Sequence, residues 1–216
     1  MIRKWLFCIL LFFPSISQAD PTYSVRLLTH FGKKFNDSGL GIGGWLIIPD
    51  VTTNPSMPLF LIGPRYQGDG YWVEAMAGPK INKSILAADA NADPIAWVQS
   101  TRFQLTPGLF KKPINVFGNL QFIDITNSGN TVPYFFLASG YVLPGQAAVI
   151  GLESENYFRL PPGGDEQFND ISVGPHIALP FKGVNIIMAY QFHIHENVED
   201  QVWVRAMYNF PGPLAK

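Results

Sequence analysis

The chain has 216 residues, enough for one domain with its own core and too few to suggest a second domain. Charged residues make up 14% of it, against roughly a quarter in soluble domains, and aromatic residues also reach 14%. Much of the surface is therefore not expected to face water. Removing Arg3 and Lys4 with the predicted leader described next leaves 13 basic and 16 acidic side chains. This net negative charge gives no support for nucleic-acid binding, which needs cations to neutralise phosphates.

Residues 1–19 are predicted to be a cleavable signal peptide. Arg3 and Lys4 form a basic head, and a short apolar stretch follows from Trp5 to Phe13. Ser17-Gln18-Ala19 then supplies the small residues of a cleavage site. The apolar stretch is too short for a membrane-spanning helix, which needs about 20 apolar residues.

Cys8 is the single cysteine of the chain and lies within this apolar stretch, not directly after the cleavage site. Neither a lipoprotein anchor nor a disulfide is therefore expected. Residues 20–216 are predicted to form a single domain. They contain no run of roughly 18 or more apolar residues, so any crossing of a membrane must use strands and not helices.

From residue 22 onward the sequence repeats one unit, an apolar or alternating segment followed by a turn rich in Gly, Pro, Asn and Asp. Segments of about nine to twelve residues suit a tilted bilayer crossing, whereas strands of water-soluble proteins usually have about five or six. The predicted strands are 22–31, 40–48, 58–66, 70–79, 82–89, 94–105, 114–124, 132–143, 146–158, 169–180, 183–194 and 202–210.

Several of these segments change polarity at every residue, as a strand with one face on lipid and the other on a lumen must do. In the last one, one face carries Val202, Val204, Ala206, Tyr208 and Phe210, and the other carries Trp203, Arg205, Met207 and Asn209. The segment 94–105 departs from the pattern, because Gln99 and Thr101 share a face with Trp97.

Connections in the second half of the chain alternate between short turns and longer loops, as in a closed meander with two different rims. Barrels of this kind keep both chain ends on one side, which requires an even number of strands. Segment 82–89 has the weakest strand pattern, and the count falls if it is discarded with a neighbour. The sequence therefore predicts an all-β, antiparallel up-and-down barrel of about twelve strands, with about ten as the alternative.

The two kinds of connection also differ in charge. The short turns carry Lys111, Lys112 and Lys182. The longer loops carry Asp124, Arg159, Asp165, Glu166, Glu196, Glu199 and Asp200. Because an acidic rim attracts cations, divalent cations are expected to gather at the longer loops.

With its signal peptide, alternating strands and final aromatic strand, the chain resembles the Gram-negative outer-membrane β-barrel superfamily. The resemblance spans residues 20–216 and implies a location in the outer membrane, with the lipid of that membrane as a partner. In that superfamily the last aromatic strand is similar to a signal for the barrel-insertion machinery, and Tyr208 and Phe210 occupy the matching positions. The chain departs from the pattern by continuing from Pro211 to Lys216.

Six charged or titratable residues lie mid-strand on, or near, the faces assigned to the interior. They are Glu74, Arg102, Glu153, Glu155, His193 and Arg205. A charge in a low-dielectric setting is tolerated only when it is paired or hydrated. We therefore expect an ion-pair and hydrogen-bond network in a plugged or water-filled lumen, and the alternative is a solute pathway lined by the same residues.

The function expected from these features is a porin-like one, structural or for passage of small solutes, without enzymatic activity or a cofactor. One alternative is a soluble periplasmic barrel that binds an apolar ligand in its mouth. Another is an outer-membrane lipid-modifying hydrolase that uses His193 or His176 with Ser139 or Ser154, although no nucleophile motif accompanies them. His193 and His195 share a strand face, but without a third ligand no metal site is expected.

Overall fold

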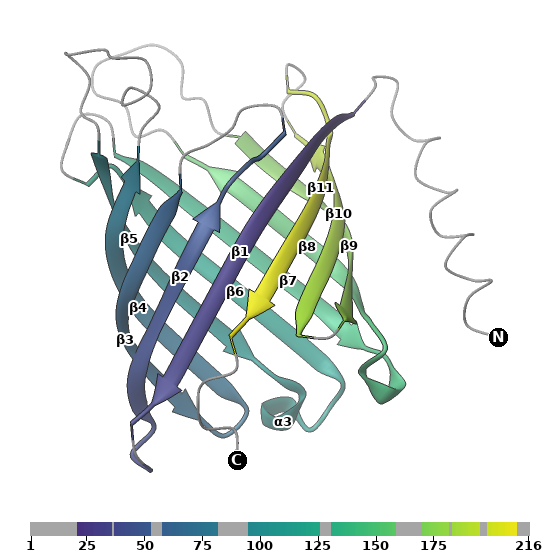
Figure 1. Ribbon diagram of the computed structural model, residues 1–216. Helices are drawn as coiled ribbons and strands as arrows, with labels where there is room; N and C mark the ends of the chain where they lie inside the picture. The colour runs from purple at the N-terminus through teal and green to yellow at the C-terminus, as the bar shows by residue number, and fades with distance from the viewer. Residues whose placement is uncertain are drawn as a thin grey trace.

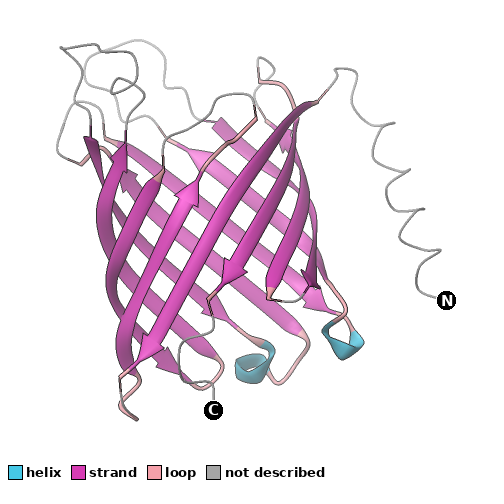
Figure 2. Cartoon of the chain, in the orientation of Figure 1, coloured by secondary structure: helices cyan, strands magenta, loops and turns pink. Residues whose placement is uncertain are grey.

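In the computed structural model the chain is a closed barrel (Figure 1). The structure describes residues 21–35, 37–52, 58–81, 95–125, 131–158, 170–181, 183–194 and 198–210. Its strands are β1 (Thr22–Lys34), β2 (Leu40–Ile48), β3 (Leu59–Gly68), β4 (Tyr71–Ile81), β5 (Ile95–Leu105), β6 (Ile114–Ile123), β7 (Val132–Val142), β8 (Val149–Tyr157), β9 (Asp170–Phe181), β10 (Val184–His193) and β11 (Gln201–Asn209). Two short helical turns, α3 (Pro107–Phe110) and η2 (Pro144–Gln146), lie between strands (Figure 2). No helix among the described residues is long and apolar enough to span a bilayer.

The predicted fold class is confirmed, because each strand pairs with its neighbours in the sequence in an antiparallel manner and β1 closes the barrel on β11. The closing pair is parallel, from Thr22 opposite Gln201 to His30 opposite Asn209. The described strands number eleven, between the two counts expected from the sequence. The expectation of an even number is thereby corrected: with a parallel closing pair, β1 begins at one rim and β11 ends at the other.

The predicted strand 82–89 lies outside the described residues. The strands on either side of it pair directly with each other, from Tyr71 opposite Leu105 to Ile81 opposite Ile95. No further strand therefore stands between β4 and β5 in the barrel wall. This pairing accounts for the difference between the count of twelve and the structure.

The two rims differ in the length of their connections, as the sequence predicted. We call the end of the barrel where β2, β4, β6, β8 and β10 begin the turn rim, at the bottom of Figure 1; the connections that precede these strands in the sequence are 35–39, 69–70, 106–113, 143–148 and 182–183. We call the opposite end, where 49–58, 82–94, 124–131, 158–169 and 194–200 join the strands, the loop rim. The exposed lysines Lys33, Lys34, Lys111 and Lys112 are all at the turn rim.

The turn between β3 and β4 shows how local sequence sets the strand register. Asp69-Gly70 connects the two strands, and Gly68 pairs with Tyr71 on either side of it. Gly70 has a φ of 77°, which the Asp-Gly hairpin turn requires and a larger residue resists. A side chain at Gly70 would also collide with the backbone of Leu109 in α3. The turn therefore fixes the register of the hairpin and leaves room for α3 to pack against Gly70.

The strands place their charged side chains and part of their apolar side chains inside the barrel, and mostly apolar side chains outside. On β4, Trp72, Glu74 and Met76 are buried while Val73 and Ala75 are exposed. On β11, Trp203 and Arg205 are buried. The departure seen in the sequence of β5 is also present, because Gln99 and Thr101 are exposed on the same side as Trp97.

Candidate functional site

A cavity of about 690 Å³ occupies the barrel interior. Its lining reaches from Pro49, Lys80 and Tyr157 near the loop rim to Pro107 and Gln146 near the turn rim. This volume is within the range of pockets that hold small organic molecules. The interior is therefore only partly filled by side chains.

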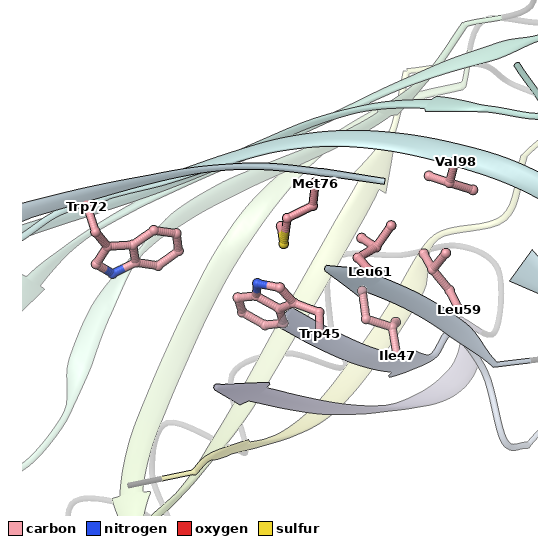
Figure 3. Packing of buried hydrophobic residues seen from close by; sticks show 7 residues of the cluster. All are labelled: Trp45, Ile47, Leu59, Leu61, Trp72, Met76 and Val98. Carbon is pink, nitrogen blue, oxygen red and sulfur yellow. The ribbon is translucent and has the colours of Figure 1, made fainter. Parts of the chain in front are cut away.

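One side of the interior is an apolar cluster contributed by β2 to β5. Its members are Trp45, Ile47, Leu59, Leu61, Trp72, Met76 and Val98, and Leu28, Phe117, Ile123 and Met207 pack against them. In Figure 3, Trp72 and the aliphatic side chains lie on opposite sides of Trp45. Because this cluster faces inward and borders the cavity, it offers an apolar surface to any molecule inside the barrel.

Glu74 is the centre of a first polar group. Its carboxylate accepts hydrogen bonds from Arg65 at 2.5 Å and from the Trp45 indole nitrogen at 2.8 Å, and it lies 2.9 Å from His30. Glu74 is fully buried, so these contacts replace the water that the carboxylate has lost. β2, which is separated from β4 by β3, leaves room for it, since a side chain at Gly43 would collide with the Glu74 carboxyl group.

Cations and aromatic rings form a stack beside Glu74. The His30 ring lies against Trp45 at 4.3 Å and Trp72 at 5.5 Å between centroids. Arg102 lies 4.3 Å above the Trp45 ring, and Arg65 lies 4.5 Å above the Trp72 ring. Guanidinium groups are attracted to the faces of tryptophan rings, most strongly where water is excluded. The stack therefore holds both arginines in defined positions.

A second polar group lies across the interior and joins β8, β11 and β1. Arg205 donates to Glu153 at 2.6 Å and to Glu155 at 3.0 Å. Arg26 donates to Glu155 at 2.8 Å. The Tyr134 hydroxyl also donates a hydrogen bond to Glu155 at 3.0 Å.

Glu153 has further neighbours besides Arg205. The amide of Gln191 donates to it at 2.5 Å, and Nδ1 of His176 lies 3.7 Å from it. That nitrogen has no hydrogen-bond partner among the described residues. Every carboxylate in the two groups thus has an arginine partner, which is the condition for keeping a charge buried.

Arg102 is placed differently from the other buried arginines. Its exposure is 2%, yet no ion pair joins it to a carboxylate of the described residues. Glu74 stands directly opposite it on β4, but the Glu74 carboxylate is occupied by Arg65, His30 and Trp45. Among the described residues, the guanidinium group of Arg102 makes one hydrogen bond, from its Nε to the Ser100 hydroxyl at 3.2 Å. Arg102 also lines the cavity.

His193 lies apart from the other predicted residues. At the loop rim its Nδ1 is 2.5 Å from Asp170, and its backbone N–H donates to Asp200. The structure thus brings Glu153, Glu155 and Arg205 together, places Glu74 and Arg102 side by side without pairing them, and leaves His193 at the rim.

The alternative sites predicted from sequence have little in the described structure to build on. No group of three or more potential metal ligands occurs among the described residues, and His195 is outside them. Ser139 is exposed on the outer side, and the Ser154 hydroxyl bonds to Ser172 and Asn156. No hydrogen bond among the described residues joins either serine to His176 or His193. Of the predicted insertion signal, Tyr208 lies in β11, and Phe210 follows it with 58% exposure.

Several interior residues were absent from the predicted set. They are Arg26, His30, Arg65, Tyr134 and Gln191. The alternation of β1 contained a signal for two of them, since Ser24, Arg26 and His30 share one face of that strand. Comparison with protein-family models finds no family that matches the chain, and comparison with curated proteins finds no matching relative.

Proposed function

We propose that the chain is a transmembrane β-barrel of the Gram-negative outer membrane that admits a small solute to its interior. The observation that carries this proposal is the inverted distribution of polarity. Glu74, Arg102 and Arg205 are buried at 0%, 2% and 4% exposure, while Leu152 and Ile62 are 59% and 55% exposed. A soluble barrel keeps apolar side chains inside and polar ones outside, whereas a barrel in lipid reverses this.

The apolar exterior extends over most of the barrel wall. Large apolar side chains with at least 37% exposure include Leu27, Phe31, Phe60, Ile62, Val73, Trp97, Leu120, Phe122, Leu137, Ile150, Leu152 and Val173. They come from β1 and β3 to β9, and soluble monomers rarely expose apolar surface so continuously. Gln99 and Thr101 interrupt this surface on β5. Strands of nine to thirteen residues are long enough for a tilted crossing of a bilayer.

The solute role is supported by the cavity and its position. Its lining includes residues near both rims, and its wall combines an apolar cluster with charged groups. In barrels of this size the interior is partly filled by side chains, so only small molecules fit. A small solute is therefore the occupant that the interior accommodates. The predicted insertion signal at Tyr208 and Phe210 and the predicted attraction of divalent cations remain part of this proposal.

Site-specific labelling tests the membrane proposal. Cys8 is the only cysteine and belongs to the predicted leader, so single cysteines can be introduced into an otherwise cysteine-free mature chain. We expect Leu152→Cys, on the outer side of β8, to react with a water-soluble maleimide at least about tenfold more slowly than Lys111→Cys in permeabilised membranes. Lipid shields the first position, while the second is exposed at the turn rim.

Unfolding in urea supplies the control, because both cysteines should then react at the same rate. A water-soluble maleimide that modifies Leu152→Cys as fast as Lys111→Cys in intact folded protein would contradict a lipid-facing β8. That result would favour a soluble barrel with an apolar ligand in its cavity.

A further inference from the structure

We propose that Arg102 binds the acidic group of a small amphipathic monoanion, such as a carboxylate with an apolar body, inside the barrel. This deepens the proposed solute role and rests on it. The starting observation is the charge of the interior. Among the described strands, the buried charged residues are the arginines Arg26, Arg65, Arg102 and Arg205 and the glutamates Glu74, Glu153 and Glu155. One more buried carboxylate, Asp50, follows β2 at the loop rim and accepts hydrogen bonds from Ser24 and Thr52.

One of the four buried arginines has no carboxylate partner among the described residues. Arg65 pairs with Glu74, Arg26 with Glu155, and Arg205 with both Glu153 and Glu155. Arg102 alone of the four lacks a carboxylate partner among the described residues. A buried cation without a counterion is costly, and an anion bound beside it removes that cost. A single guanidinium group without a carboxylate partner matches a monoanion better than a multiply charged anion.

Polar groups around Arg102 form a wall suited to an acidic group. Asn119 on β6 stands opposite Arg102, and Gln121 stands opposite Ser100, so the four residues form a contiguous patch facing inward. Ser100 donates to the Asn119 amide oxygen at 2.9 Å, which orients that amide. Both amides border the cavity. Their N–H groups have no partner among the described residues, so they are available beside the guanidinium group.

The apolar body of the ligand has a defined place as well. The Arg102 guanidinium is stacked 4.3 Å above Trp45, which belongs to the apolar cluster. Val98 lies on the same inward face of β5, and Phe117 lies on that of β6. A molecule whose acidic group meets Arg102 therefore brings its remaining atoms against Trp45, Val98 and Phe117.

Calorimetry on the full mature barrel in lipid nanodiscs tests this proposal, with empty nanodiscs as the blank. The probes are 3-phenylpropionate, the uncharged 3-phenylpropanol, and acetate, which lacks the apolar body. We expect 3-phenylpropionate to bind at one site, and the other two probes to bind at least about tenfold more weakly. Arg102→Gln should weaken 3-phenylpropionate about tenfold or more, whereas Lys33→Gln, which removes an exposed cation at the turn rim, should leave it unchanged.

The urea midpoint of unfolding is a second measurement, and a purely structural role of Arg102 would change it in the opposite direction. Arg102→Met removes an unpaired buried cation, so we expect its urea midpoint to equal or exceed that of the wild type. The probe should raise the midpoint of the wild type but not that of Arg102→Met. Binding of 3-phenylpropionate that is absent, or equal in wild type and Arg102→Gln, would overturn the proposal. Labelling of Leu152→Cys is measured without ligand. A failure of this binding proposal can therefore be distinguished from a failure of the proposed membrane location.

Discussion

Replacing Arg205 by methionine is expected to lower the free energy of unfolding by about 3–5 kcal/mol. Arg205 is 4% exposed and donates to both Glu153 and Glu155. Without it Glu155 keeps Arg26, but Glu153 loses its only guanidinium partner among the described residues and remains buried as a carboxylate. Urea titration of the refolded barrel in lipid vesicles, followed by tryptophan fluorescence, measures the loss.

The matched control removes both members of the pair. Arg205→Met combined with Glu153→Gln leaves no unpaired charge at Glu153, and the new amide retains a contact with Gln191. We expect the double variant to be less destabilised than the sum of the two single variants, with a coupling of about 0.5–3 kcal/mol. Strict additivity would contradict an ion pair that holds β8 and β11 together across the interior.

An arginine placed on the outer face in the middle of the wall is expected to destabilise a lipid-embedded barrel by about 2–4 kcal/mol. Ile62 is suitable because it lies in the middle of β3, between Gly44 and Ala77, and is 55% exposed. Ile62→Arg introduces a charge where the bilayer midplane is proposed. The same urea titration in vesicles measures the change.

Phe35→Arg is the control for depth. Phe35 is 64% exposed and follows β1 at the turn rim, where an arginine in a membrane barrel costs only about 0–1 kcal/mol. In a soluble barrel both substitutions are on a water-exposed surface, where changes usually stay within about 0.5 kcal/mol. Equal small effects at Ile62 and Phe35 would therefore argue against lipid around the barrel.

Strand positions and faces were predictable because they depend on local pattern. The segments 40–48 and 202–210 correspond to β2 and β11 to within one residue. Alternation assigns each side chain to one of two faces, since neighbouring residues in a strand point in opposite directions. The burial of Glu74 and Arg205 therefore followed from sequence, whereas the parallel pairing that closes the barrel joins the two ends of the fold and has no local signature.

Ion-pair partners were predictable only within a hairpin. The Asp69-Gly70 turn sets Gly68 opposite Tyr71, and counting back along both strands puts Arg65 opposite Glu74. That pair could have been found from the sequence. The contact of Arg205 with Glu153 crosses the interior between strands that are not neighbours, so it depends on the curvature of the whole barrel. For Arg102 the register alone would predict a pair that does not form. It faces Glu74 on the neighbouring strand, but the Glu74 carboxylate bonds to Arg65, His30 and Trp45 instead.

Fractionation of cells that express the full chain, followed by a detergent gel of unboiled and boiled samples, is the most direct test of a lipid-embedded barrel. We expect the protein in the outer-membrane fraction, with a mobility that changes on boiling, because a closed barrel resists the detergent until it is heated. A protein recovered from the periplasm as a detergent-free monomer would contradict the membrane location.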